Sequence, residues 1–133
     1  MTLSKNEYWI MELLWNAEKP LSRQEILQGT EGRKWNPSSI HLILNSMLSK
    51  GVIKISDEEK RYARTYEAVI SQEEYVAEYV AEGLPNTSRE NQLRCVVNAL
   101  VNQKGIDRKT IEELEEMLRR KKAEVEKGIT IYK

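Results

Sequence analysis

The sequence predicts a mainly α-helical protein with a small β-ribbon. Three observations lead to this fold class. Segments with helical periodicity occupy the first fifty residues, two short segments of alternating side chains follow, and the second half consists of further amphipathic helices. The expected division is a first domain at 1–70, a helical domain at 71–126 and a C-terminal tail at 127–133.

Three helix starts are visible in the first half. Ser4-Lys5-Asn6-Glu7 and Ser22-Arg23-Gln24-Glu25 are capping boxes, in which the serine hydroxyl and the glutamate carboxylate satisfy unpaired amides at a helix start. Asn36-Pro37 combines a side-chain acceptor at the cap with a proline at the first helical position. The expected helix ends are Asn16, Gly29 and Gly51.

A two-stranded ribbon is expected after the third helix. Val52-Ile53-Lys54-Ile55 and Tyr62-Ala63-Arg64-Thr65-Tyr66 have the composition of short strands, and the charged segment 56–61 between them is suited to a turn. Three helices followed by such a ribbon is the element order of a winged helix-turn-helix domain. The first domain is therefore predicted to have this fold.

The second half predicts three amphipathic helices. Their starts are a capping box at Ser71-Gln72-Glu73-Glu74, a cap at Thr87 or Ser88, and a cap at Asp107. A first domain that is already closed cannot cover three apolar stripes, so we expect them to pack against a second copy of the chain, with a single six-helix monomer as the alternative. The expected dimerisation residues are Tyr75, Tyr79, Leu93, Val96, Val97, Leu100, Leu114, Met117 and Leu118.

Composition argues against several classes of protein. Cys95 and His41 are the single cysteine and the single histidine, so we expect no disulfide framework, no metal site, no cofactor and no enzyme activity. No apolar run is long enough to span a bilayer, which predicts a cytoplasmic protein without membrane insertion. Cys95 and the three tryptophans are expected to be buried in packing positions.

Several segments resemble one known family. They are Leu3-Ser4-Lys5-Asn6-Glu7-Tyr8-Trp9-Ile10-Met11, Trp35-Asn36-Pro37-Ser38-Ser39-Ile40, Ser49-Lys50-Gly51, Arg61-Tyr62-Ala63-Arg64-Thr65-Tyr66 and Ile111-Glu112-Glu113-Leu114. In order and spacing, from about Leu3 to Lys122, they are similar to the penicillinase-repressor family of bacterial regulators (the BlaI/MecI type). The resemblance implies a homodimeric repressor on a palindromic operator, released when a membrane-linked sensor protease causes cleavage of the C-terminal domain.

Two departures from the family bear on how repression ends. The family cleavage point is an Asn-Phe pair, whereas the aligned residues here are Ala99-Leu100 and the chain contains no phenylalanine. The paired Cys-x-Cys motifs of the copper-sensing branch are also absent, since one cysteine is present in total. Proteolytic release is therefore one hypothesis, and release by a small ligand bound between the helical arm and the winged domain is another.

The third helix and the ribbon supply the candidate DNA contacts. The net charge is zero, with ten basic and nine acidic residues up to position 70, so an interface with phosphates requires local clustering. Asn45 is suited to adenine, His41 to guanine or phosphate, and Leu42 to a thymine methyl group. The candidate contacts are Arg33, Lys34, Ser38, Ser39, His41, Leu42, Asn45, Ser46, Lys50, Lys60, Arg61 and Arg64, with Arg23 and Lys54 as further phosphate anchors.

The weak charge of the predicted recognition helix leaves one more alternative open. A winged-helix domain can bind a protein partner in place of DNA. Retention on heparin or on random duplex DNA at low salt distinguishes the two, because a protein-binding domain would flow through.

Overall fold

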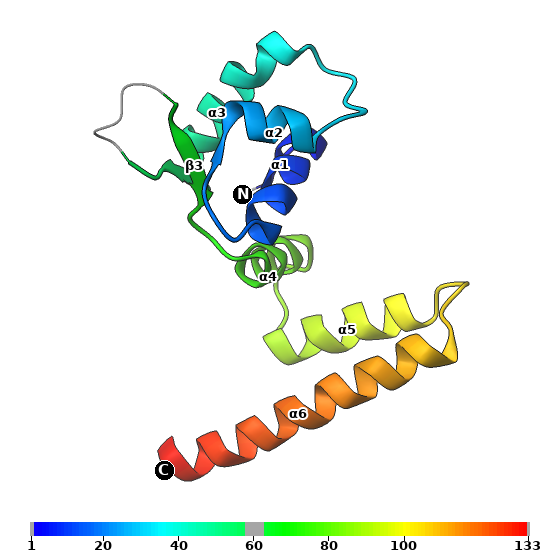
Figure 1. The fold of residues 1–133 in the computed structure, drawn as a ribbon. Coiled ribbons are helices and arrows are strands. Elements are labelled where there is room, and N and C mark those ends of the chain that lie inside the picture. Colours follow the sequence, from blue (N-terminus) through cyan, green and yellow to red (C-terminus); the bar gives the residue numbers. More distant parts are fainter. Residues whose placement is uncertain (1, 58–62, 133) are drawn as a thin grey trace. The chain divides into compact units, whose positions relative to one another are not determined.

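The computed structural model describes residues 2–57 and 63–132. The chain divides into two compact units, one ending at Pro85 and the other starting at Asn86. Figure 1 shows the course of the chain through both units, and each unit is described by itself below.

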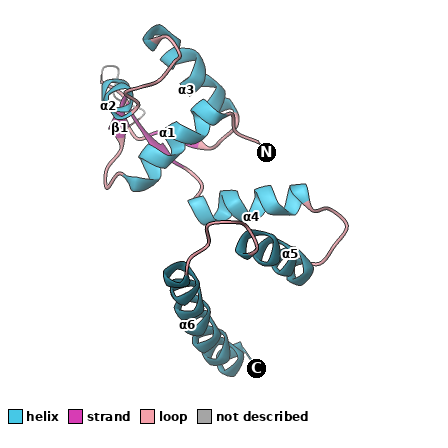
Figure 2. Cartoon of the chain, turned by 90° about the vertical axis from the view of Figure 1, so that its right-hand side faces the viewer, coloured by secondary structure: helices cyan, strands magenta, loops and turns pink. Residues whose placement is uncertain are grey.

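The first unit contains four α-helices and three short strands, and Figure 2 shows the strands as a minor part of a mainly helical structure. This architecture confirms the predicted fold class. The elements in chain order are α1 (Lys5–Asn16), β1 (Leu21–Ser22), α2 (Arg23–Gly29), the 3-10 turn η1 (Pro37–Ser39), α3 (Ile40–Ser49), β2 (Ile53–Ile55), β3 (Thr65–Ala68) and α4 (Gln72–Gly83).

The helices begin where the capping boxes predict. The hydroxyl oxygens of Ser4, Ser22 and Ser71 each accept a hydrogen bond from the backbone amide three residues later. In each case the glutamate at that third position accepts one from the backbone amide of the serine. The first backbone amides of a helix have no partner within the helix, and the capping box supplies partners for some of them. This local pattern can be read from the sequence.

The sheet has three strands in the order β1-β3-β2, and both pairings are antiparallel. The predicted ribbon is present as β2 and β3, with Ile55 opposite Tyr66, but β3 (Thr65–Ala68) lies later in the chain than the predicted segment 62–66. Strand β1 was not predicted, because two residues are too short for an alternating pattern to appear. It pairs Leu21 with Tyr66 and so fixes the start of α2 against the β2–β3 ribbon, which is called the wing below.

One hydrophobic core holds the first unit together. Helix α1 contributes Ile10, Met11 and Leu14, α2 contributes Ile26, and the inner face of α3 contributes residues that recur at helical spacing. The wing closes the core with Val52 and Tyr66. The core residues from α3 are Ile40, Leu44 and Met47.

Helix α4 belongs to the first unit, whereas the predicted domain boundary at residue 70 lies before it. Tyr75 is buried, and its ring lies 5.7 Å from that of Tyr8 and 6.2 Å from that of Trp15 between centroids. The indole nitrogen of Trp15 donates to the carbonyl of Ile70 at 2.8 Å. Within this chain Tyr75 is therefore a core residue of the first unit, which departs from its expected place on a dimerisation surface.

The second unit consists of α5 (Arg89–Val101) and α6 (Arg108–Tyr132), joined by a turn in which Gly105 has a φ of 93°. Helix α6 continues through the segment 127–132 that was expected to be a loosely ordered tail. Cys95 is exposed in the single chain, in contrast to the expected burial. No helix within the described ranges is both long and apolar enough to cross a membrane.

Candidate nucleic-acid interface

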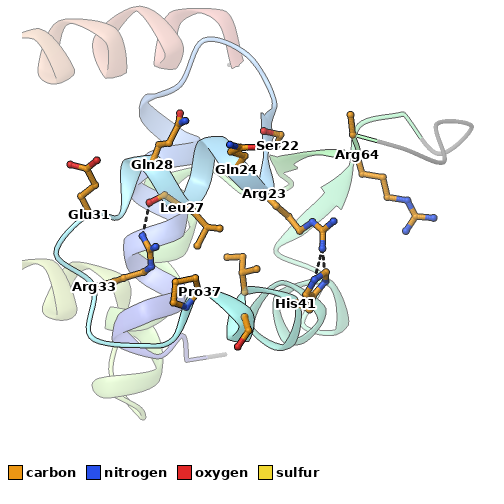
Figure 3. Close-up of a pocket in the computed structure, with 13 residues that line it drawn as sticks. Ser22, Arg23, Gln24, Leu27, Gln28, Glu31, Arg33, Pro37, His41 and Arg64 are labelled. Carbon is orange, nitrogen blue, oxygen red and sulfur yellow. Dashed lines mark hydrogen bonds between the residues drawn. The ribbon is translucent and has the colours of Figure 1, made fainter.

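An open depression of about 760 Å³ lies where α2, the start of α3 and the approach to β3 meet. Figure 3 shows the side chains that surround it, with Arg23 directed toward His41 and Arg64 extending away from the body of the unit. The polar and charged lining residues are Ser22, Arg23, Gln24, Gln28, Glu31, Arg33, Ser38, His41 and Arg64.

Helix α3 separates an inner face from an outer one. Its buried residues anchor the helix to the core, while His41, Leu42 and Asn45 are exposed on the other side. Leu42 is 73% exposed and so presents an apolar side chain on this face. Ser38 is exposed and Ser39 half-buried at the start of this segment. The outer face thus offers hydrogen-bonding groups and one apolar side chain at the same end of the helix.

Arg23 and His41 connect the first turn of α2 with the first turn of α3. The guanidinium Nη1 of Arg23 lies 2.6 Å from the Nδ1 of His41, and both side chains are exposed. The contact bridges residues from the two helices that a helix-turn-helix presents to a duplex. It places a cation beside the outer face of α3, which itself carries no charged residue.

Some cations of the first unit are paired with acidic side chains and others are not. Lys19 pairs with Glu25 and Lys54 pairs with Glu67 at 2.9 and 3.1 Å. Among the described residues of this unit, Lys5, Arg23, Lys34 and Arg64 are exposed and have no acidic partner. Two of these four, Arg23 and Arg64, line the depression, so local clustering supplies positive charge that the overall composition does not.

Arg33 is held by its own domain. Its Nη1 donates to the carbonyl oxygens of Leu27 and Thr30 at 2.6 and 3.2 Å, and its guanidinium lies 5.2 Å from the centroid of the Trp35 ring. These carbonyls belong to the C-terminal end of α2, where a cation is favourable. Arg33 therefore braces the connection between α2 and η1.

Ser46 and Lys50 also contact another part of the domain. The hydroxyl of Ser46 donates to Glu7 Oε2 at 2.9 Å, and the Nζ of Lys50 lies 2.7 Å from Glu7 Oε1. Burial acts to raise the pKa of the Glu7 carboxyl, but hydrogen bonds from Lys50, Ser4 and Ser46 together outweigh it and hold the pKa below its ordinary value. Glu7 is thus a buried carboxylate with its charge compensated.

The remaining sequence-based candidates divide simply. Lys60 and Arg61 lie outside the described residues. Gln24 and Gln28, one turn apart on α2 and both exposed, line the depression although the sequence analysis did not select them. The sequence signal that could have identified them is their position next to Arg23, one turn apart on the same helix.

In the parts of the chain that the structure describes, no three His, Cys, Asp or Glu side chains gather in a way that could hold a metal ion.

Comparison with solved structures gives distant similarities. The ferric uptake regulator of Francisella tularensis with iron is 20% identical over 51% of this chain and 53% of that chain, with a TM-score of 0.43, so this chain spans about half of that protein's length. The transcriptional regulator PA3341 is 17% identical over 93% and 80%, with a TM-score of 0.45. The Helicobacter pylori ferric uptake regulator Fur is 18% identical over 66% and 73%, with a TM-score of 0.44.

Comparison by sequence is more informative. No curated protein matches the chain significantly. The profile that describes the penicillinase repressor matches residues 3–120, which includes both compact units. The chain therefore belongs to the penicillinase repressor family.

Proposed function

We propose that this protein is a homodimeric repressor that inserts α3 into the major groove of a palindromic operator. The observation that carries the proposal is the outer face of α3. The inner face of this helix packs on the core, and two cations without an acidic partner among the described residues, Arg23 and Arg64, lie beside it. A recognition helix needs this combination of a rigid base, exposed polar groups and adjacent positive charge. No charged residue on α3 itself supplies the attraction, so the neighbouring elements must.

Base reading falls to the exposed side chains of the outer face. Asn45 can form the bidentate pair with adenine, and His41 can donate to a guanine acceptor. Leu42 is suited to a thymine methyl group, because its exposed apolar side chain can pack against that group. Ser38 and Ser39, near the N-terminal end of the helix, are suited to phosphate oxygens.

Phosphate binding falls to cations that no acidic side chain neutralises. Among the described candidate contacts, Arg23, Lys34 and Arg64 are exposed and meet this condition. Lys60 and Arg61, at the expected tip of the wing, are retained as proposed contacts on the sequence pattern alone. Lys54 is a weaker candidate, because it forms an ion pair with Glu67 across the β2–β3 ladder.

Dimerisation falls to the second unit. Its described residues include no buried side chain, although α5 and α6 carry many apolar ones. A unit without a core of its own gains stability by covering these residues against another copy. The most exposed of them are Leu93, Leu100, Met117 and Leu118. Val96, Val97 and Leu114 complete the set expected from sequence in this unit, whereas Tyr79 lies on α4 of the first unit.

Two experiments test the proposal together. Footprinting on the DNA upstream of the protein's own gene should reveal a protected site with two half-sites about one helical turn or a multiple apart. Sedimentation equilibrium at micromolar concentration should give the mass of two chains. A monomer that leaves the promoter unprotected contradicts the proposal, and failure to bind heparin at low salt would favour a protein-binding role.

Two routes of induction are proposed, each with a structural argument. Because Ala99 lies inside α5 near its C-terminal end, a protease could cleave this segment only after local unwinding of the helix. The neighbouring Leu100 is 60% exposed. Alternatively, a depression of about 390 Å³ between α1 and α4, lined by Tyr8, Tyr75 and Tyr79, is suited to a small aromatic ligand. Incubation with a cognate sensor protease separates the two, since an intact α5 after incubation leaves ligand binding.

A further inference from the structure

We infer that Glu7 is a positioning residue for DNA reading, which fixes the orientation of α3 through Ser46 and Lys50. This inference rests on the proposed function of α3 as the recognition helix. It assigns Ser46 and Lys50 to the support of the helix, whereas the sequence alone suggested that they contact DNA.

The first argument is the isolation of the Glu7 carboxylate from solvent. Glu7 is 4% exposed and is the only acidic residue that is buried among those the structure describes. A buried carboxylate is strongly unfavourable unless it is paired and hydrogen-bonded. Here Oε1 accepts from the backbone amide of Ser4 at 2.8 Å and from Lys50 Nζ at 2.7 Å, and Oε2 accepts from the Ser46 hydroxyl at 2.9 Å.

The second argument is the spacing of the two partners on α3. Ser46 and Lys50 are four residues apart, so they lie one above the other on one side of the helical path. Two attachments one turn apart restrict both rotation of the helix about its axis and sliding along it. A single attachment would leave one of these motions free.

The third argument is the neighbourhood of the attached side. Asn45 directly precedes Ser46, and any rotation that moves Ser46 moves Asn45 relative to the duplex. Lys50 also donates to the carbonyl oxygen of Thr2 at 3.3 Å, so the end of α3 is bound to the segment that precedes α1 as well as to α1. A small misplacement of hydrogen-bonding groups is expected to weaken operator binding more than random-duplex binding, because contacts with base edges carry the sequence information and phosphate contacts do not.

The test measures the ratio of operator affinity to random-duplex affinity for Glu7→Gln, Lys50→Met and the double variant. Each single change leaves one charged partner without its counter-ion, and the double change removes both charges. We expect each single variant to lower the ratio about tenfold, and the double variant to lower it by less than the product of the two. Glu12→Gln is the matched control, since Glu12 is exposed on the same helix and should leave the ratio unchanged.

Ser46→Ala keeps the Glu7–Lys50 ion pair and so tests the inference even where Glu7→Gln reduces folding. It should lower the ratio by a few-fold, with random-duplex affinity unaltered. The inference would be overturned if all variants weakened binding to the operator and to random duplex equally. It would also be overturned if the effect of the double variant on the ratio equalled the product of the two single effects. A decrease of about one in the salt slope for Lys50→Met would also overturn it, because it would identify Lys50 as a phosphate contact. Absence of operator binding by the unaltered protein would instead contradict the proposed function.

Discussion

The phenolic oxygen of Tyr75 accepts a hydrogen bond of 3.2 Å from the backbone amide of Leu3, although the two residues are 72 positions apart. Through this contact the first turn of α4 is attached to the segment that leads into α1. The first unit therefore extends beyond the β2–β3 ribbon and includes the helix that was expected to begin the dimerisation domain.

The first prediction concerns this attachment. Tyr75→Ala should lower the free energy of unfolding by about 3 kcal/mol, since it removes a buried ring that packs on Tyr8 and Trp15. Glu78→Ala is the matched control, because Glu78 is exposed on the same helix. Chemical denaturation of the full chain checks both. Equal destabilisation by the two variants would contradict the assignment of α4 to the first unit.

A second prediction concerns the cations around the depression. Arg23→Ala and Arg64→Ala should each weaken binding to every DNA sequence and reduce the slope of log affinity against log salt by about one. Arg108→Ala, in the second unit and paired with Glu112, should leave the slope unchanged. Titrations of operator and random duplex at several salt concentrations provide the measurement. An unaltered slope for Arg64→Ala would remove that residue from the interface.

A third prediction concerns base reading. Asn45→Ala should weaken operator binding by about 1–3 kcal/mol and relax specificity at one base pair of each half-site. Binding to random duplex should change little, because Asn45 carries no charge. A panel of operators with single substitutions checks this. Uniform loss across the panel would mean that Asn45 does not read a base.

A fourth prediction concerns pH. Hydrogen bonds from the backbone of Ser22 and from Lys19 lower the pKa of Glu25 to about 2. An unfolded glutamate titrates at about 4.3, so this carboxylate stabilises the fold above that pH and the contribution is lost as pH falls toward 2. The thermal midpoint of the protein should therefore exceed that of Glu25→Gln near neutral pH, and the two should converge only as the pH approaches 2. A difference that stays constant over this range would contradict the assignment.

A fifth prediction concerns dimerisation. Leu118→Lys should shift the protein toward a monomer at micromolar concentration, because it places a charge among the apolar residues of α6. Glu115→Lys changes charge more strongly on the same helix and should leave the dimer intact, since Glu115 is an exposed polar position. Sedimentation equilibrium distinguishes the two. A dimeric mass for both variants would exclude this stretch of α6 from the interface.

Local chemistry was sufficient to predict most elements. The capping boxes at Ser4, Ser22 and Ser71 and the proline at the start of η1 are readable because their effect depends on residues at most three positions away. Ile40, Leu44 and Met47 recur at helical spacing in α3 and are buried, because an amphipathic helix turns its apolar side toward the core.

What only the tertiary structure decided were relationships between distant residues. No local pattern distinguishes Lys50, whose ammonium pairs with Glu7, from Arg64, which has no acidic partner among the described residues. The reason is that a side chain's partner depends on which helix lies beside it. Likewise, the stripe that carries Tyr75 shows that α4 buries one face, and the packing of Tyr8 and Trp15 against that ring determines where. Periodicity along the chain indicates that a face is covered, whereas the identity of the cover depends on contacts across the fold.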